Sequence, residues 1–377
     1  MSRKIASHYA LINDRLERNI VVSVDDAGRI IAIEQAEAID RMAGVEFYSG
    51  VLIPAMVNAH AHLELSYLHG AIAEGTGFAG FAREIGRVRG GYSEEKRCHA
   101  AAVADAQMWE EGVAAVADIA NDELVMNIKQ QSKIYYHTLF EFFGLNNTSL
   151  DELKAVALDH NATVTPHSTY SVQDAPFRSI SKLGEHPLSL HFLESEAEAE
   201  LYEGRGSLAA WYERMGWQCD FLHYGSPARR IVESIPASRS LMLVHACMAT
   251  PEDVELLNNH FGDRVTWVLC PESNRYISSL RPPVEMLRAM GAHIAIGTDS
   301  LSSARHLSMV QNMTLLGNDI PLAELLTWAT RNGAQALGLG DKLGTIELGK
   351  SPGLAIIEGA DLNKLQLTKE TTSRRLL

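Results

Sequence analysis

The sequence predicts an α/β fold, a (β/α)8 TIM-type barrel with a small β-sandwich built from both chain termini. Eight short apolar runs alternate with helical patterns through the middle of the chain, and both ends are rich in short strands. Runs of Val, Ile and Leu that alternate with helices imply a parallel sheet. An open, doubly wound sheet is the alternative. Its dinucleotide-binding version is disfavoured because no Gly-x-Gly-x-x-Gly follows the first run.

The two chain ends are expected to form the small sandwich from residues 1–52 and 346–377, with the barrel over residues 53–345. Within residues 20–34, two apolar runs flank Asp26-Ala27-Gly28, which is the pattern of a β-hairpin. Residues 344–359 have the same strand-like character. Both ends of the chain are therefore predicted to be β-rich.

The middle of the chain supplies the predicted barrel strands. Eight strand–helix units within about 250 residues match the size of a (β/α)8 barrel. The apolar runs cover residues 52–60, 112–120, 133–143, 162–170, 187–195, 241–249, 264–273 and 292–300.

The composition sets limits on location and partners. The chain has 377 residues and a formal net charge of −14, which argues against nucleic acid or an anionic membrane as its main partner. The N-terminus has no apolar signal-peptide region, and no run approaches the roughly 18 apolar residues of a membrane span. None of the four cysteines forms a Cys-x-x-Cys pair. These observations predict a reduced, cytoplasmic protein.

Polar side chains follow most of the predicted strands, where a barrel carries its catalytic groups. His60 and His62 stand two residues apart on an extended segment, so both can face one ion. His191 and Asp299 follow the fifth and eighth strands and complete an open site suited to one divalent ion, Zn or Fe(II). Hydrogen-bonded core histidines are the alternative, which the four residues together disfavour.

Two further groups are candidates for proton transfer. Glu194 follows His191 by three residues and can take a proton from an activated water and pass it to a substrate. His245, after the sixth strand, is expected to hold that water, since the ligand set is already filled. Glu196, Glu198 and Glu200 are expected to be solvated charges of the following helix. For Asp118 we expect a structural hydrogen bond.

The ordered motifs of this sequence resemble the amidohydrolase superfamily, in particular its chlorohydrolase and deaminase branch. They are PAMVNAHAHLELS, TPHSTY, HFLESEAE, LVHACM, CPESNRYI and GTDSLSS. The resemblance implies that His60, His62, His191 and Asp299 bind the metal. It also implies that Glu194 is the proton shuttle and that His245 and Asp299 hold the nucleophilic water. Thr165-Pro166-His167 stands where two-metal members carry a bridging Lys, which implies one metal ion per chain.

Within this branch, the sequences HLELS, GTGFAGF and CPESNRYI resemble 6-aminodeoxyfutalosine deaminases of the alternative menaquinone pathway. The implied reaction is hydrolytic deamination of this nucleoside to futalosine and ammonia. Deamination of S-adenosylhomocysteine, methylthioadenosine or adenosine is the alternative, as is a chlorohydrolase-like reaction on another heterocycle. A non-enzymatic protein with a structural metal is disfavoured because Glu194 and His245 would then have no task.

The candidate substrate contacts are Glu64, Ser66 and His167 for the nucleoside, with Glu64 suited to sugar hydroxyls. A substrate carboxylate would need a cation, and an Arg fork matches it bidentately. Arg83 and Arg275 are the preferred candidates, whereas Arg87 and Arg89 are expected to be solvated helix charges. A homo-oligomer is possible on this sequence.

Overall fold

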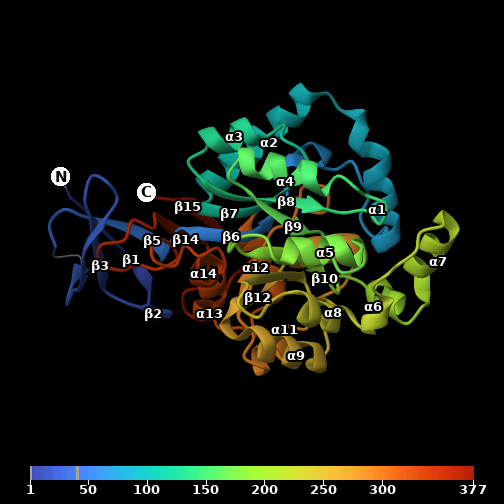
Figure 1. Ribbon diagram of the computed structural model, residues 1–377. Coiled ribbons are helices and arrows are strands. Elements are labelled where there is room, and N and C mark those ends of the chain that lie inside the picture. The colour runs from blue at the N-terminus through green and yellow to red at the C-terminus, as the bar shows by residue number, and fades with distance from the viewer. Residues whose placement is uncertain (1, 40–41) are drawn as a thin grey trace.

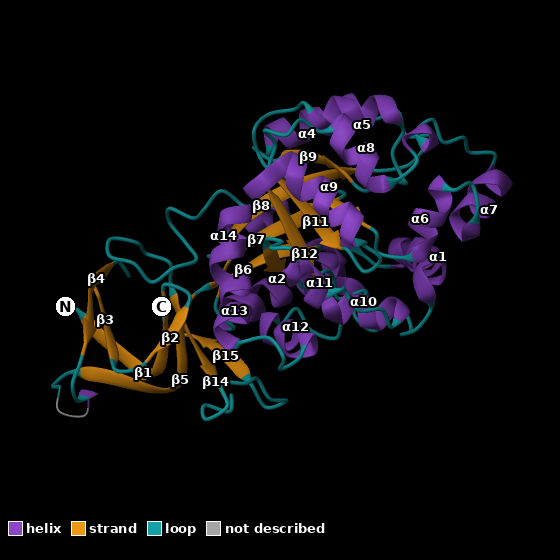
Figure 2. Cartoon of the chain, turned by 90° about the horizontal axis from the view of Figure 1, so that it is seen from below, coloured by secondary structure: helices purple, strands orange, loops and turns teal. Residues whose placement is uncertain are grey.

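The structure, a computed structural model, describes residues 2–39 and 42–377. Figures 1 and 2 show terminal strands gathered at one end of the molecule and a larger α/β region at the other. The terminal strands form a seven-stranded sheet of order β15-β14-β5-β1-β3-β4, with β2 paired to β1. Its members are β1 (Arg3–Ile12), β2 (Arg15–Glu17), β3 (Ile20–Val24), β4 (Ile30–Gln35), β5 (Val45–Pro54), β14 (Leu354–Glu358) and β15 (Thr372–Arg375).

The pairing in this sheet joins segments that are far apart in sequence. Strand β5 pairs in parallel with β1 on one side and antiparallel with β14 on the other. The predicted hairpin is present as the antiparallel pair β3 and β4. Residues 344–353 carry no strand, so the β character predicted there begins only at Leu354. The two chain ends meet in one mixed sheet, so the predicted two-layer sandwich is not confirmed. The division into residues 1–52 with 346–377 and residues 53–345 stays a prediction.

All eight predicted strands of the middle region are present, in two parallel sheets of four. The first sheet contains β6 (Met56–Ala61), β7 (Val113–Ala120), β8 (Tyr135–Phe142) and β9 (Thr163–Pro166). The second sheet contains β10 (Leu188–Phe192), β11 (Leu241–His245), β12 (Val265–Leu269) and β13 (Ile294–Ile296). Small and branched side chains of both sheets pack into one interior cluster, including Val57, Ala117, Val244 and Val268.

The two sheets meet along two seams. At each seam, the described residues form one isolated parallel bridge, Ala61 with Asp299 and Ser168 with His191. Side chains reinforce the first seam, where the Asn58 amide donates to Thr298 Oγ1 at 2.7 Å. The α/β class with parallel strands is confirmed, whereas a continuous hydrogen-bonded ladder around a closed barrel is not detected.

The helices follow the strands as the alternating pattern predicts. Their ends obey local capping chemistry, because α9 begins with a reciprocal Thr250–Asp253 capping box and has Pro251 at its first turn. The helices are α1 (Gly77–Val88), α2 (Glu94–Glu110), α3 (Met126–Gln131), α4 (Leu150–Asp159), α5 (Asp174–Ser181), α6 (Glu196–Tyr202), α7 (Gly206–Met215), α8 (Pro227–Ser234), α9 (Pro251–Phe261), α10 (Pro271–Ser278), α11 (Val284–Ala289), α12 (Met309–Leu316), α13 (Leu322–Thr327) and α14 (Gly333–Ala336).

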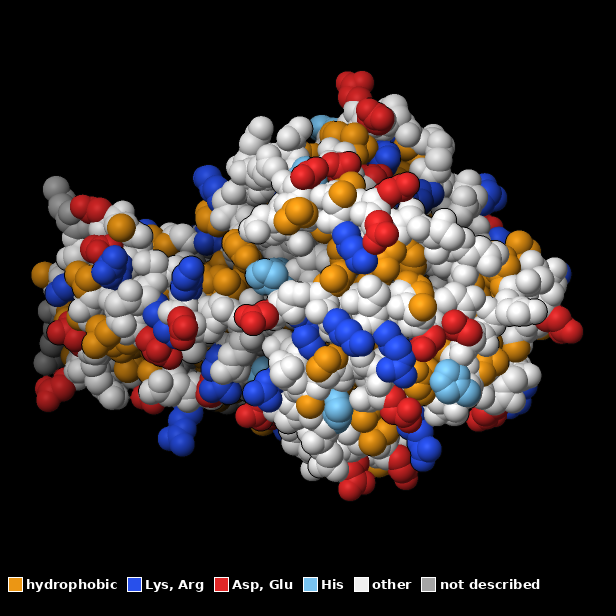
Figure 3. Space-filling model, viewed as in Figure 1, with side chains coloured by type: hydrophobic (Ala, Val, Ile, Leu, Met, Phe, Trp, Pro, Cys, Tyr) orange, Lys and Arg blue, Asp and Glu red, His pale blue; other side chains and the backbone are white. Residues whose placement is uncertain are grey.

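Helices α1, α6 and α7 lie at the end of the molecule away from the terminal sheet (Figures 1 and 2). Acidic and basic side chains both occur across the face drawn in Figure 3. Within the described part of the chain, every helix is too short or too polar to cross a bilayer. All four cysteines are free thiols, and Cys247 and Cys270 are buried as their apolar sequence surroundings predict.

Candidate active site

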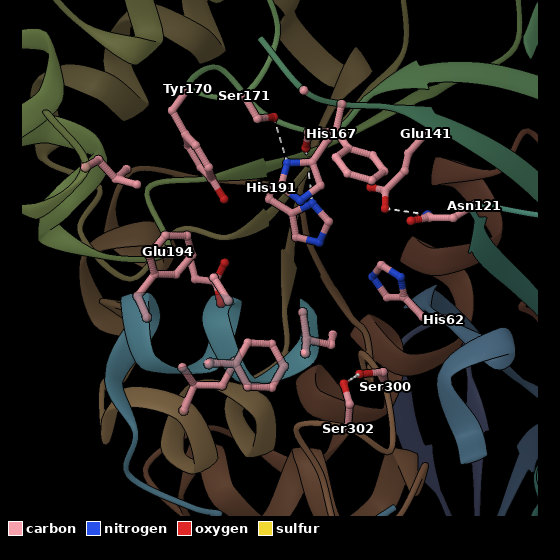
Figure 4. Close-up of a pocket in the computed structure, with 18 of the residues that line it drawn as sticks. His62, Asn121, Glu141, His167, Tyr170, Ser171, His191, Glu194, Ser300 and Ser302 are labelled. Atoms are coloured by element: carbon pink, nitrogen blue, oxygen red, sulfur yellow. Dashed lines mark hydrogen bonds between the residues drawn. The ribbon is translucent and has the colours of Figure 1, made fainter. Parts of the chain in front are cut away.

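A cavity of about 370 Å³ lies beyond the carboxyl ends of the parallel strands, beneath α1 and α7. One wall is apolar and largely aromatic, and it is formed by Phe78, Phe81, Ile85, Phe143, Leu145, Tyr170, Leu208, Trp211, Tyr212, Trp217 and Ile277. The opposite part carries the polar groups of the strand ends. Figure 4 shows Glu194 on one side of this cavity and Glu141 with Asn121 on the other.

The predicted metal ligands come together at the polar end of the cavity. His60 Nε2 and His62 Nε2 are 3.2 Å apart, and Asp299 Oδ1 lies 3.5 Å from His62 Nε2. Two ligands at 2.0–2.1 Å from one tetrahedral ion lie about 3.3 Å apart. His60 and His191 also form a triad with His245 whose ring nitrogens lie within 4.8 Å of one another. The chemistry and spacing of these groups therefore fit one divalent cation.

Hydrogen bonds orient two of these side chains, His191 and Asp299. His191 Nδ1 donates to the His167 carbonyl oxygen at 3.1 Å, which leaves Nε2 with a free lone pair. Asp299 Oδ2 accepts from Ser273 Oγ at 2.5 Å and from Ser303 Oγ at 3.1 Å, so Oδ1 remains available. Burial lowers the pKa of His60 and His62 well below the ordinary value and that of His191 to about 4. The imidazoles are therefore neutral, as metal ligands must be.

Glu194 lines the same cavity, and its Oε2 lies 3.8 Å from His245 Nε2. Burial raises the pKa of Glu194 to about 7, where a carboxyl group can both accept and release a proton near neutral pH. The Asn274 amide nitrogen is 2.9 Å from His245 Nδ1 and donates to it. His245 Nε2 is therefore the protonated nitrogen and faces Glu194 as a hydrogen-bond donor.

Three residues at the polar end of the cavity have strained backbone conformations. Leu193, His245 and Asp299 all have positive φ, at 46°, 78° and 58°. Leu193 directly follows β10, His245 ends β11, and Asp299 lies three residues after the end of β13. Such conformations cost about 1–3 kcal/mol where a Cβ is present. Residues held in this way collect at functional sites because the surrounding structure fixes their side-chain direction.

The structure separates the three predicted nucleoside contacts. His167 lines the cavity, with Nδ1 2.9 Å from Ser171 Oγ. Glu64 and Ser66 are buried behind the wall and do not line the cavity. The Ser66 hydroxyl donates to the Leu63 carbonyl at 2.7 Å, so its hydrogen bond is made within its own turn. Glu64 Oε2 accepts from the backbone N–H of Asn121 at 2.9 Å, so its carboxylate holds part of the wall in place.

The candidate arginines are placed differently from the sequence expectation. Arg83 and Arg275 are exposed and do not line the cavity. Arg89, expected to be a solvated helix charge, does line it. Its Nη2 donates to Glu64 Oε1 at 3.0 Å and its Nη1 donates to Asn121 Oδ1 at 3.0 Å. Arg89 is the C-cap residue of α1, and the contacts with Glu64 and Asn121 hold its side chain at the cavity.

Sequence reasoning missed two polar groups of the cavity, Asn121 and Glu141. The Asn121 amide donates to Glu141 Oε1 at 2.6 Å, while Glu141 Oε2 is buried without a hydrogen-bond partner. Asn121 directly follows β7 and Glu141 stands near the end of β8. The sequence signal for both residues is their position at the ends of the second and third predicted strands.

The acidic run after Glu194 needs one correction. Glu196 is exposed as expected, but Glu198 is only 1% exposed and is not a solvated helix charge. Its carboxylate accepts from the Leu193 N–H and from the Thr169 hydroxyl. Asp118, by contrast, has the expected structural role, because it is buried against Lys129 and accepts from the Leu63 N–H at 2.8 Å.

A strand-end cluster of three histidines and an aspartate beside a glutamate is typical of metal-dependent hydrolases. The Amidohydrolase family model matches residues 51–374, and the chain belongs to the amidohydrolase family. The sequence-based prediction of this family, and of a hydrolase acting on C–N bonds, is thereby confirmed.

Similar proteins include several nucleoside deaminases. An adenosine deaminase of Helicobacter pylori is 29% identical over 332 residues, which cover 82% of this chain and 79% of that protein. A 5-methylthioadenosine/S-adenosylhomocysteine deaminase of Teredinibacter turnerae is 25% identical over 339 residues, covering 83% and 73%. The crystal structure of Helicobacter pylori aminofutalosine deaminase with methylthio-coformycin has a TM-score of 0.82 at 25% identity, covering 97% of this chain and 93% of that one.

Proposed function

We propose that this chain is a metal-dependent hydrolytic deaminase of an adenine-type nucleoside. The observation that carries the proposal is the position of Glu194, in the cavity wall and 3.8 Å from His245, beside a cluster of metal-ligating groups. The likeness to an adenosine deaminase and to a solved aminofutalosine deaminase supports the same reaction class.

His60, His62, His191 and Asp299 hold one divalent ion, Zn or Fe(II), in this proposal. Such an ion supplies Lewis-acid activation of water when bound. His245 and Asp299 hold the attacking water by hydrogen bonds. His245 donates through Nε2, because Asn274 donates to its Nδ1.

Glu194 moves the protons of the reaction. It takes a proton from the attacking water and delivers it to a ring nitrogen, which makes the amine-bearing carbon more electrophilic. The water oxygen bonds to that carbon, and the C–N bond to the amino group then breaks. The amino group leaves as ammonia with the remaining water proton, so that one water and one amine give one carbonyl and one ammonia.

The particular substrate we propose is 6-aminodeoxyfutalosine, converted to futalosine in menaquinone biosynthesis. The aromatic wall suits the extended, partly aromatic substituent of this nucleoside. Adenosine, S-adenosylhomocysteine and methylthioadenosine are the alternative substrates, and the likeness to the Helicobacter pylori and Teredinibacter turnerae deaminases supports them.

Arg89 is the residue we propose for binding a substrate carboxylate, in place of Arg83 and Arg275. Its guanidinium is fixed by Glu64 and Asn121, so little further ordering is needed when a ligand binds. A bidentate Arg–carboxylate pair is stronger than a neutral hydrogen bond.

The test compares kcat/KM for 6-aminodeoxyfutalosine, its descarboxy analogue and adenosine, using metal-replete protein. Losing a buried Arg–carboxylate contact costs about 2–5 kcal/mol, so the first substrate should exceed the other two by well over tenfold. Arg89→Met should remove this preference, while Arg83→Met, a matched change on the exposed face of α1, should keep it. Similar values for the three substrates would refute carboxylate recognition and favour a general adenosine-type deaminase. Ammonia release from none of the nucleosides would refute the proposed function.

A further inference from the structure

Glu198 is a buried carboxylate that the proposed reaction does not use. It lies in the first turn of α6, four residues after Glu194, and only 1% of its surface is exposed. Burial of a carboxylate is unfavourable unless its oxygens are well bonded. The partners of these oxygens therefore indicate what the residue does.

One oxygen of Glu198 holds the backbone that carries Glu194. Oε2 accepts from the N–H of Leu193, the residue directly before Glu194, at 2.5 Å. Leu193 has a φ of 46°, a conformation that a branched side chain rarely adopts without support. The carboxylate thus stabilises a strained turn whose direction sets where the Glu194 side chain points.

The other oxygen of Glu198 reaches the neighbouring strand end. Thr169 Oγ1 donates to Oε1, and the Thr169 carbonyl accepts from Arg230 Nη1 at 2.6 Å and from Tyr202 Oη at 2.8 Å. Thr169 belongs to the segment after β9 that also carries His167 and Tyr170, both of which line the cavity. One carboxylate therefore joins the turn of Glu194 to the neighbouring loop after β9, which also lines the cavity.

An ordinary capping role does not account for these contacts. Ser195-x-x-Glu198 has the spacing of a capping box, in which the glutamate would accept from the N–H of Ser195. Here the Ser195 side chain makes no cap hydrogen bond, and the glutamate accepts from the Leu193 N–H instead. The contact of Glu198 with Leu193 therefore stabilises the turn that precedes α6.

From this geometry we infer that Glu198 is a positioning residue for Glu194, fixing its turn relative to the His167–Tyr170 loop. The inference rests on the proposed function, since it takes Glu194 as the proton carrier. A displaced proton carrier lowers turnover, because a shift of about 1 Å at a reacting group can cost up to a hundredfold. The bound metal is unaffected, because none of its proposed ligands contacts Glu198.

The experiment measures kcat, KM, metal content and the thermal unfolding midpoint for Glu198→Ala, Glu198→Gln and Glu198→Asp. We expect Glu198→Ala to lower kcat by about tenfold or more, with a smaller change in KM and full metal content. Glu198→Gln should keep kcat within about threefold, since its amide oxygen can accept from the Leu193 N–H and its NH2 can donate to Thr169 Oγ1. Glu198→Asp, too short to reach both loops, should resemble the alanine variant.

Glu196→Ala is the matched control, since it removes the same type of side chain from an exposed position two residues earlier on α6 and should leave kcat unchanged.

A Glu198→Ala enzyme with wild-type kcat and a lowered unfolding midpoint would overturn the inference in favour of a purely structural role. So would a Glu198→Gln variant as impaired as Glu198→Ala. If the alanine variant does not fold, the inference is tested by comparing the other two variants. Glu198→Gln should then have a higher kcat than Glu198→Asp. Loss of activity in Glu194→Gln with normal kcat in the Glu198 variants would refute this inference alone, whereas activity in Glu194→Gln would refute the proposed mechanism itself.

Discussion

In His191 and His245, the hydrogen-bond partner of one ring nitrogen determines the protonation of the other ring nitrogen. The His167 carbonyl accepts from His191 Nδ1, and the Asn274 amide donates to His245 Nδ1. The same ring therefore presents a lone pair at His191 and a proton at His245, although both rings are buried and lie 5.4 Å apart. This difference is consistent with the proposed roles of His191 as a metal ligand and of His245 as a hydrogen-bond donor.

Glu194→Gln is expected to keep the metal and lose most turnover. The amide is isosteric and leaves the ligand cluster intact, but it cannot accept and release a proton. Removal of a general acid–base typically lowers kcat by 10²–10⁴-fold. Steady-state kinetics with metal analysis measures both effects, and a kcat near that of the wild type would exclude Glu194 as the proton carrier.

His60→Ala is expected to reduce the metal content from about one equivalent per chain to near zero. His60 is fully buried, and its Nε2 lies next to that of His62, so the substitution removes one ligand from the centre of the cluster. Metal analysis after dialysis gives the stoichiometry. Two tightly held ions in the wild type, or none, would contradict the proposed mononuclear site.

Arg230 shows how one side chain supports a whole loop. Its guanidinium lies between the rings of Phe177 and Phe221, at 4.3 and 4.1 Å from their centroids. Its two terminal nitrogens donate to the carbonyls of Thr169 and Val172, which flank the cavity residues Tyr170 and Ser171. The loop after β9 is thus held from α8 as well as by Glu198 of α6.

Arg230→Met is expected to lower the free energy of unfolding by roughly 2–4 kcal/mol, because two buried carbonyls lose their donors. It should also raise KM, since the loop that carries Tyr170 and Ser171 is no longer fixed. Chemical denaturation and steady-state kinetics measure these effects. Arg229→Met, on the exposed side of the same helix, should change neither quantity; an equal loss there would point to a general effect of charge removal.

The pair β8 and β9 contains a histidine that should make stability depend on pH. Burial lowers the pKa of His137 to about 4, below the value of about 6.5 for an unfolded chain. Between these values the unfolded state binds more protons, so stability is present above pH 6.5 and is lost as the pH falls towards 4. The loss from this residue is about 3 kcal/mol at most. Denaturation of wild type and His137→Gln across this range measures it, and a pH-independent difference between them would contradict the assignment.

The terminal sheet and the α/β region are joined by Arg375 of β15. Its Nε donates to the Trp109 carbonyl at 2.9 Å, and its Nη2 donates to the Val113 carbonyl at 2.7 Å. The guanidinium also lies 3.5 Å from the centroid of the Trp109 ring. The last strand of the chain is thereby joined to the start of β7, far from α1 and α7 (Figure 2).

Arg375→Ala is expected to lower the unfolding midpoint while leaving kcat/KM unchanged. Two carbonyls would lose their donor and the Trp109 ring its cation, a loss of about 2–4 kcal/mol. Calorimetry and steady-state kinetics test the two parts separately. Arg374→Ala is the control, because this neighbour pairs with Glu358 at the exposed surface and should cost less than about 1 kcal/mol.

Periodicity in the sequence was sufficient for the strands and for the ligand cluster, because both depend on local patterns. Each apolar run became a strand, and the polar residues after the runs converged once the strands lay parallel. Arg89 and Glu198 could not be placed in this way. Their burial depends on a helix end and on contacts with Asn121 and Thr169, which lie 32 and 29 residues distant in sequence.

The substrate, the metal identity, the cytoplasmic location and the oligomeric state stay predictions, because none of them follows from how the chain packs.

The pairing of β14 with β5 also has a consequence during synthesis on the ribosome. Strand β5 ends at Pro54, but its partner β14 begins at Leu354, after the whole α/β region has been translated. The edge of β5 that pairs with β14 therefore remains unpaired while most of the polypeptide emerges from the ribosome. An unpaired strand edge is prone to join a neighbouring chain. Nascent chains stalled before residue 354 should accordingly depend on chaperones, and release from that dependence should coincide with the emergence of β14.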